Sequence, residues 1–122
     1  MRQNFLNTTQ KGRYYEEQAA EYLKNLGFKI IRRNFFARSG EIDIIASEGD
    51  TTVFVEVKYR RTECMGKPYE AVDFRKRQKI ITAARYYAAK EGLYSGPVRF
   101  DVVEITGSHI THIRDAFRAT EV

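Results

Sequence analysis

The sequence predicts a single α/β domain in which a central mixed β-sheet is flanked by α-helices. The order of hydrophobic patterns along the chain is α-β-β-β-α-β-β, and the β segments are short runs rich in Val, Ile and Phe. All 122 residues fit within one domain, so residues 1–122 are assigned to it. Hydrophobic residues make up 43% of the chain and charged residues 30%, as in ordinary globular proteins.

The first predicted helix covers residues 12–26, and Gly27 ends it. Its apolar residues recur at helical spacing: Tyr15, Ala19, Tyr22, Leu23 and Leu26. Residues 28–36 follow as a partly basic strand. Two further strands, 40–46 and 53–58, are separated by a turn signal that is typical of a hairpin.

The second half of the chain predicts one helix and two strands. The helix covers residues 71–90 and carries alanine, isoleucine and tyrosine on one face. Glycine and proline between 92 and 97 break the chain, and a fourth strand follows at 98–105. The HITHI segment at 109–113 predicts the fifth strand.

Composition limits where the protein acts and what it binds. No apolar run could span a bilayer, the N-terminus has no apolar stretch of signal-peptide length, and a single cysteine, Cys64, forms no internal disulfide or zinc knuckle. We therefore expect a cytoplasmic protein without membrane association. The net charge of +5 and a sequence pI near 9.4 favour a nucleic-acid partner.

Carboxylates interrupt the central predicted hairpin. A two-residue turn at Gly49-Asp50 would place Asp43 opposite Glu56 and Glu41 opposite Lys58. A four-residue loop gives the same pairing, whereas a loop of odd length would shift it. Strict alternation would put Ile42, Ile44 and Ala46 together on the other, apolar face.

Asp43 opposite Glu56 is an unfavourable pair. Two like charges ~4 Å apart repel by about 4 kcal/mol at an effective dielectric constant of about 20. Protonation of one carboxyl, a bound cation or neighbouring basic groups would relieve this repulsion. One interpretation is a salt-bridged surface with an ordinary Glu41–Lys58 ion pair, but the flanking apolar residues predict a buried site, which favours a ligand.

An acid followed after a gap by Glu-x-Lys on a strand resembles the PD-(D/E)xK nucleases. In that arrangement Asp43 and Glu56, with the backbone carbonyl of Val57, would hold Mg²⁺ or Mn²⁺. The metal would lower the pKa of a bound water and neutralise charge on the scissile phosphate. Lys58 would orient the attacking water or stabilise the developing negative charge.

The whole chain resembles the YraN-like family, small bacterial proteins assigned to the PD-(D/E)xK superfamily. The resemblance rests on these motifs: Gly12, Glu16 and Ala19 in the first helix, GEIDII from Gly40, FVEVK from Phe54, Lys76, RFDVV from Arg99 and IRDAF from Ile113. Archaeal Holliday-junction resolvases are similar in their core. The superfamily's proline before the aspartate is absent, since Ile42 stands there, whereas Tyr59-Arg60 fits the family's K-Y-R form.

The resemblance implies a restriction-endonuclease-like fold and an active site made of Glu16, Asp43, Glu56 and Lys58, with Glu41 as a supporting acid. It implies a divalent-metal-dependent endonuclease acting on DNA, including branched or Holliday-junction DNA, and a resolvase role would favour a homodimer. Two alternatives remain: a nucleic-acid-binding module that keeps this fold without cleavage, and a protein-interaction subunit whose acidic face is structural.

Four basic residues are candidates for nucleic-acid contact. Arg60 and Arg61 directly follow the Glu-x-Lys strand, and Lys76 and Lys79 share one face of the second helix. The alternative for the two lysines is a solvated basic helix.

The remaining polar residues predict structural roles. Asp101 alternates with Arg99 and is expected to pair with it. His109 and His112 would face opposite sides of a strand and so do not predict a metal pair. Cys64 has no histidine nearby to act as a base.

Overall fold

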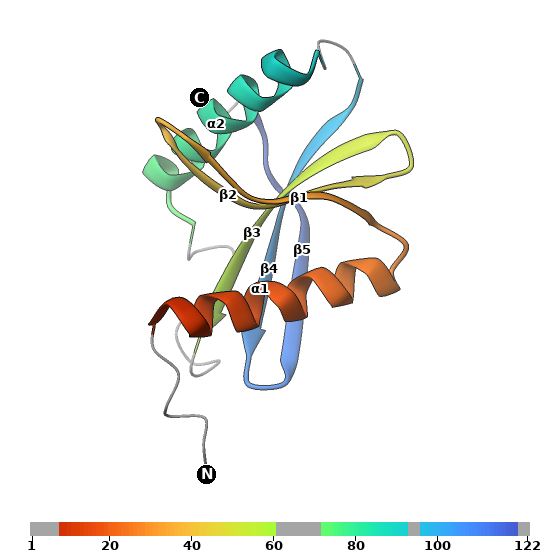
Figure 1. The fold of residues 1–122 in the computed structure, drawn as a ribbon, viewed down its shortest axis with the longest axis vertical. Coiled ribbons are helices and arrows are strands. Elements are labelled where there is room, and N and C mark those ends of the chain that lie inside the picture. Colours follow the sequence, from red (N-terminus) through yellow and green to blue (C-terminus); the bar gives the residue numbers. More distant parts are fainter. Residues whose placement is uncertain (1–7, 61–71, 93–95, 120–122) are drawn as a thin grey trace.

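The predicted α/β fold is confirmed in the computed structural model, which describes residues 8–60, 72–92 and 96–119. The element order is α-β-β-β-α-β-β, as the sequence indicates (Figure 1). The elements are α1 (Thr8–Asn25), β1 (Lys29–Ala37), β2 (Gly40–Glu48), β3 (Thr51–Arg60), α2 (Phe74–Glu91), β4 (Val98–Thr106) and β5 (His109–Phe117).

The five strands form one mixed sheet in the order β1-β2-β3-β4-β5. β1, β2 and β3 are antiparallel neighbours, β3 and β4 are parallel, and β4 and β5 are antiparallel. Parallel neighbours need a crossover, and α2 lies in the connection between β3 and β4. The sheet is strongly twisted, so the β1–β2 turn and the end of β3 point in different directions (Figure 1).

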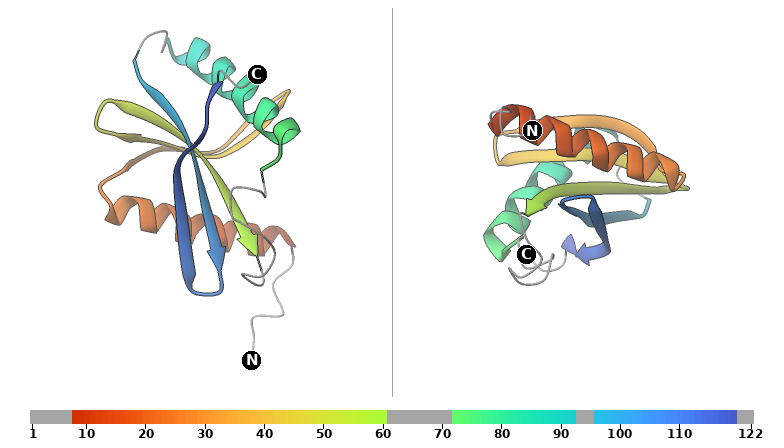
Figure 2. Two further views of the ribbon diagram at one scale, coloured as in Figure 1. Left: turned by 180° about the vertical axis from the view of Figure 1, so that it is seen from behind. Right: turned by 90° about the horizontal axis from the view of Figure 1, so that it is seen from below.

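The two helices cover opposite faces of the sheet (Figure 2). The α1 side buries Ala19, Ala20 and Leu23 against alternate strand residues that include Ile44 and Val55. The α2 side buries a second, aromatic-rich cluster that includes Phe35, Ile45, Phe54, Ile81 and Tyr87. Sheet faces covered on both sides explain the continuous apolar strand sequences. No helix in the described part of the chain is long and apolar enough to cross a membrane.

The central hairpin turn agrees with its sequence signal. β2 ends at Glu48 and β3 begins at Thr51, so the connection is the two-residue turn at Gly49-Asp50, and Gly49 takes the positive φ of 59° that such a turn requires. Ile45 lies opposite Phe54, which is the predicted register.

The start of α2 differs from the sequence prediction by a few residues. Asp73 is the N-cap, and its carboxylate accepts a hydrogen bond of 2.9 Å from the amide of Lys76. The helix therefore begins at Phe74 and not at residue 71, which lies outside the described residues. The helical spacing of apolar residues carries no signal for this cap, so the sequence predicts a helix that begins too early.

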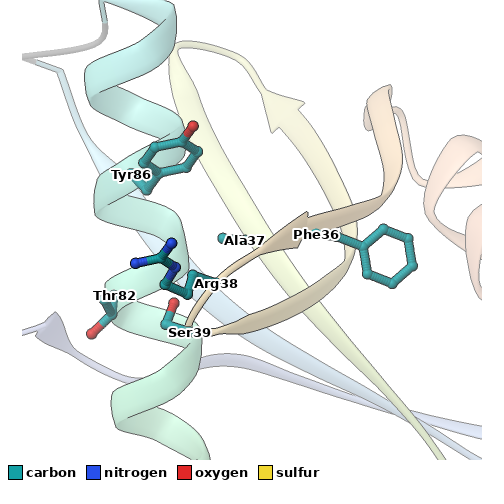
Figure 3. A pocket seen from close by; sticks show the side chains of 6 residues that line it. All are labelled: Phe36, Ala37, Arg38, Ser39, Thr82 and Tyr86. Carbon is teal, nitrogen blue, oxygen red and sulfur yellow. The ribbon is translucent and has the colours of Figure 1, made fainter.

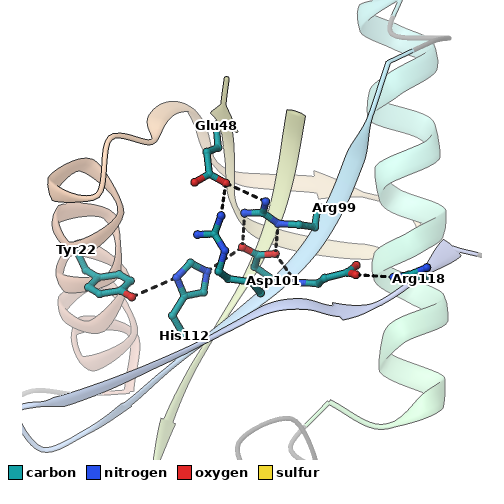
Figure 4. A network of polar contacts seen from close by, with 8 residues as sticks. Tyr22, Glu48, Arg99, Asp101, His112 and Arg118 are labelled. Carbon is teal, nitrogen blue, oxygen red and sulfur yellow. Dashed lines mark hydrogen bonds and ion pairs between the residues drawn. The ribbon is translucent and has the colours of Figure 1, made fainter. Parts of the chain in front are cut away.

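A buried carboxylate, Asp101 on β4, joins the two C-terminal strands. Its side chain is fully buried and receives Arg99 Nε at 2.8 Å, Arg99 Nη2 at 3.0 Å and the backbone amide of Asp115 at 3.0 Å. His112 Nε2 lies 2.8 Å from Asp101 Oδ2 (Figure 4). Burial would raise the pKa of Asp101, but the hydrogen bonds from His112, Arg99 and Asp115 outweigh it and hold that pKa at about 2.

This polar network also fastens α1 and the β2–β3 turn to the same strands. An ionised carboxylate can only accept, so His112 Nε2 donates to it, while His112 Nδ1 lies 3.2 Å from the hydroxyl of Tyr22 on α1. Arg99 Nη1 also reaches Glu48 at 2.9 Å, at the end of β2 (Figure 4). The expected Arg99–Asp101 pair is confirmed, and His112 belongs to this network whereas His109 is exposed.

Removing the charge of Asp101 should destabilise the fold. We expect Asp101→Asn to lower the free energy of unfolding by about 3 kcal/mol at pH 7, because the partly buried Arg99 loses its fully buried partner and keeps only Glu48. Urea denaturation measures this change. Because the folded pKa of about 2 lies below the unfolded value near 4, the stabilisation is present above pH 4 and is lost as pH falls towards 2.

Asp115→Asn is the matched control for this variant. Its carboxylate is partly exposed and pairs with Arg118 at the surface, so the same substitution should cost at most about 1 kcal/mol. Equal destabilisation by the two substitutions would contradict the role given to Asp101.

Candidate active site

The predicted site lies where β2 and β3 separate. Their regular pairing runs from Glu48–Thr51 to Ile44–Val55. At the next position the carboxylate of Asp43 accepts a hydrogen bond of 2.8 Å from the amide of Val57. A side chain thus takes the place of a strand partner, and the predicted direct opposition of Asp43 and Glu56 within the ladder is not formed.

The alternation of β2 also changes at this point. Ile42 packs in the α2-side cluster with Ile45, whereas Ile44 packs in the α1-side cluster. The prediction that Ile42, Ile44 and Ala46 share one face is therefore wrong for Ile42. The irregularity coincides with Asn34 on β1, which has a positive φ of 55° and lies between the paired positions Arg33–Ile44 and Phe35–Ile42.

The separation brings acidic side chains together from three elements. One carboxylate oxygen from each of Glu16, Glu41 and Asp43 lies within 4.8 Å of the others, a spacing that could hold a metal ion. Glu16 comes from α1, and the other two come from β2. Glu56 on β3 lines the same cavity as Glu16 and Asp43, so it adjoins this group. The Glu41 carboxylate therefore lies where it could bind a metal ion directly, whereas the sequence predicts only a supporting role for it.

Burial raises the pKa of three of these acids, and the charges of neighbouring carboxylates add to this effect for Asp43 and Glu16. Burial is the main cause of the raised pKa of Asp43, about 8, and the nearby charges of Glu56, Glu16 and Glu41 add to it, opposed by the Val57 amide. Burial also raises the pKa of Glu56 and of Glu16, although neighbouring lysines oppose the first and Asn34 the second. Oxygen ligands whose ionised forms are disfavoured in this way fit a divalent cation, which would neutralise them.

Two lysines contact Glu56 at the edge of this acidic group. Lys76 Nζ on α2 lies 3.5 Å from Glu56 Oε2, and Lys58 Nζ on β3 lies 3.9 Å from the same oxygen. The ion pair of Lys58 is therefore with Glu56, in place of the Glu41–Lys58 pair of the structural interpretation. Lys76 is thus part of the site, a placement that helix periodicity alone could not give.

The acids open into a cavity of about 340 Å³ between α1 and β3. Tyr15 and Tyr59 form one wall and stack with their ring centroids 4.0 Å apart. Burial and the hydrogen bond with Tyr59 raise the pKa of Tyr15 to about 12, so it stays protonated at neutral pH. Gly12 also lines the cavity, and a Cβ there would meet no neighbouring atom, so this glycine leaves the wall open.

Arg60 and Lys79, two further predicted nucleic-acid contacts, differ in how far their side chains are exposed. Arg60 has only 11% of its side chain exposed and pairs with the buried Glu104 at 3.1 Å, so its guanidinium already has a structural partner. Lys79 is exposed on α2, beside Gly40 at the start of β2. Arg61 and Cys64 lie outside the described residues.

Sequence reasoning missed the tyrosine pair and the function of Asn34. Helical spacing places Tyr15 in the apolar stripe of the first helix, and Tyr59 stands out in the sequence through the K-Y-R form and its neighbouring basic residues. The stack depends on the crossing of α1 over β3, which no local pattern encodes. The only available signal for Asn34 was its residue type, because asparagine tolerates positive φ better than most residues.

Comparison with known proteins places this geometry in a family. Residues 15–105 match the family described as "Uncharacterised protein family UPF0102", a span that contains the four acids, the two lysines and the two tyrosines of the site. The chain belongs to the UPF0102 family. The YraN-like resemblance inferred from the motifs is thereby confirmed.

The similarity to relatives covers most of this chain and most of each relative. A UPF0102 protein of Clostridioides difficile is 45% identical over 114 residues, covering 92% of this chain and all of that protein. One from Persephonella marina is 44% identical over 107 residues, covering 88% of this chain and 92% of the relative. One from Desulforapulum autotrophicum is 46% identical over 111 residues, with 88% and 92% covered.

Removing the Asp43 charge should stabilise this UPF0102 protein in the absence of metal. The unfolded carboxyl ionises near pH 4 and the folded one near pH 8, so the folded state binds an extra proton between these values and loses stability as pH rises through them. We expect Asp43→Asn in EDTA to match the unmodified protein near pH 4 and to melt at least ~3 °C higher at pH 8.

A metal titration separates this effect from general stabilisation. Millimolar Mg²⁺ or Mn²⁺ should raise the melting temperature of the unmodified protein, and Asp43→Asn should lose most of that rise. The control is Asp50→Asn in the exposed β2–β3 turn, which should change neither result. A variant Asp43→Asn that melts lower than the unmodified protein at pH 8 would contradict the pKa assigned here.

Proposed function

We propose that this protein is a divalent-metal-dependent endonuclease that hydrolyses phosphodiester bonds in DNA. The observation that carries the proposal is the partly buried Asp43, whose pKa is raised to about 8 by loss of hydration and by the surrounding carboxylates Glu56, Glu16 and Glu41. A fold built only for stability would place a counter-ion here, as it does at Asp101. An arrangement that remains unfavourable without a cation fits a metal-binding catalytic site.

The residues fit Mg²⁺ or Mn²⁺. Asp43 would be the central ligand, since it lies within ligand spacing of Glu16 and Glu41 and lines the same cavity as Glu56. The carbonyl of Val57 is a further candidate ligand, because its own amide is held by Asp43. The bound metal would supply an activated water and neutralise charge on the scissile phosphate.

The lysines would complete the reaction chemistry. Lys58, with 31% of its side chain exposed, reaches from Glu56 towards solvent, where it can orient the attacking water or stabilise the developing charge. Lys76, which is also exposed, could contact a neighbouring phosphate when the metal replaces its contact with Glu56. Both lysines contact the Glu56 carboxylate, and these contacts hold it in position before substrate binds.

DNA is the proposed substrate because basic residues surround the acidic cavity. A charge of +5 favours a polyanion, and Lys76 and Lys79 continue away from the site on α2. Branched DNA and a symmetric dimer belong to the proposal through the likeness to junction resolvases, and a cytoplasmic location follows from the substrate. The second candidate is a nucleic-acid-binding module with the same site and no cleavage.

Cleavage assays test the catalytic assignment. Labelled linear, flapped and four-way-junction DNA would be incubated with the protein and Mg²⁺ or Mn²⁺, beside RNA of the same sequence. We expect Asp43→Ala and Lys58→Ala to lower the cleavage rate at least ~100-fold, because one removes the central ligand and the other the charge at the reacting phosphate.

Binding measurements on the same variants separate the two candidates. Asp50→Ala, an exposed acid of the β2–β3 turn, should cut at the unmodified rate. Salt-sensitive binding without any cleavage would favour the binding module. A protein that neither binds nor cuts these substrates would refute both nucleic-acid functions.

Lys79 should contribute to affinity through a phosphate contact. We expect Lys79→Gln to weaken DNA binding equally for all sequences and to reduce the slope of log K against log salt by about 1. The matched control is Lys24→Gln at the exposed end of α1, where the lysine pairs with Glu21. An unchanged slope for Lys79→Gln would assign that lysine to the solvated face of α2.

A further inference from the structure

A second hollow lies between the β1–β2 turn and α2. It has a volume of about 820 Å³, within the usual range of small-molecule sites. Its lining residues are Phe36, Ala37, Arg38, Ser39, Thr82 and Tyr86. Figure 3 shows Tyr86 and Arg38 on the side of α2, whereas the ring of Phe36 points away from that helix. The hollow therefore presents one aromatic ring and one guanidinium.

Tyr86 is an exposed aromatic ring with a fixed position. More than half of the residue, 55%, is open to solvent, yet its ring lies 6.1 Å from the buried Phe35 ring. Such backing holds one side of the tyrosine while another part remains open. Arg38 is exposed beside it, and no ion pair of Arg38 is recorded among the described residues. A flat, electron-rich group could be held by both side chains.

One face of α2 connects this hollow to the candidate active site. Lys76, Lys79, Thr82 and Tyr86 are separated by three, three and four residues, the spacing of one helical face. Lys76 contacts Glu56 at the first end, and Tyr86 lies in the hollow at the other end. Ten residues of helix span about 15 Å, a distance that a few nucleotides of one DNA strand can cover.

We propose that this hollow holds an unpaired nucleobase of the DNA strand bound at the active site, stacked on Tyr86 and against Arg38. The proposal rests on the proposed nuclease function and specifies its substrate. Aromatic rings and guanidinium planes stack on single-stranded bases, and the lysines between the two sites match the phosphates of the intervening strand. A paired base inside a duplex offers no free face, so the hollow selects flapped, branched or single-stranded DNA.

A second copy of the chain is the competing occupant. The basic residues favour the nucleobase, because an interface between two copies would bring the positive α2 faces, with Lys79 on each, near one another. Leucine distinguishes the two occupants. It keeps an apolar contact between protein chains but removes the flat ring on which a base stacks.

The test measures DNA binding in EDTA, so that it does not depend on cleavage. Fluorescence anisotropy would compare a flapped DNA with a blunt duplex of the same length for the unmodified protein and for Tyr86→Phe, Tyr86→Leu and Arg38→Gln. We expect Tyr86→Leu to weaken binding of flapped DNA about 5- to 100-fold with little change for the duplex, and Tyr86→Phe to bind like the unmodified protein. Arg38→Gln should weaken binding to a smaller extent.

Tyr14→Leu is the matched control. This tyrosine is half exposed on α1, where it borders a hollow lined by Glu17 and Glu21 whose charge repels DNA. We expect its binding to remain unchanged. A flapped DNA carrying 5-iodouracil at successive unpaired positions should crosslink to Tyr86 from one preferred position, and that position should lie within a few nucleotides of the cleaved bond where cleavage occurs.

The outcomes separate this inference from the proposed function. If Tyr86→Leu loses flap binding and the unmodified protein does not cleave DNA in the presence of metal, the base site is supported and the nuclease is refuted. Normal flap binding and cleavage by Tyr86→Leu would overturn the base site and leave the nuclease intact. A dimer in sedimentation that Tyr86→Ala dissociates, without a change in DNA binding, would assign the hollow to a second copy and overturn the inference.

Discussion

The hydrogen bond from the Val57 amide to the carboxylate of Asp43 sets the geometry on which the rest of the site depends. It lies immediately beyond the last regular pair of β2 and β3, Ile44–Val55, and satisfies a backbone donor that the strand partner no longer reaches. The two strands can separate there without leaving that amide unpaired. The separation opens the cavity, admits Glu16 from α1 and lets Asp43 meet Glu56.

The environments of the fully buried Asp101 and the partly buried Asp43 have opposite effects on their carboxylates. Asp101 receives a guanidinium, an imidazole and a backbone amide, and its pKa is held at about 2. Asp43 receives one amide and faces other carboxylates, so its pKa is raised to about 8. The environment of Asp101 shows that this sheet can supply counter-charges to a buried carboxylate, which Asp43 does not receive. Leaving Asp43 uncompensated costs stability, and a bound cation would recover it.

The helix α2 has more than a packing role. One face buries Ile80, Ile81 and Tyr87 against the sheet, while another extends from Lys76 beside Glu56 to Tyr86 in the second hollow. A rigid helix fixes the separation of the two hollows, so both would act on one DNA strand at a set distance. Substrate shape, in place of base sequence, would then decide what the protein binds.

The sequence by itself determined the order of elements and the membership of the acidic site. Apolar spacing located both helices and all five strands, and the Gly49-Asp50 turn fixed the hairpin register, because turn length leaves only one phase for the flanking residues. Charged residues within otherwise buried strands then identified Asp43 and Glu56, since burial makes an unpaired carboxylate costly.

Only the tertiary structure decided how those residues meet. The change of face at Ile42 coincides with Asn34 in the neighbouring strand, and the contact of Lys76 with Glu56 depends on how α2 packs on the sheet. Arg60, predicted to face DNA, is paired with Glu104 on the parallel strand β4. Contacts between distant segments follow from sheet twist and helix placement, and these arise from the whole core, which no local pattern in the sequence records.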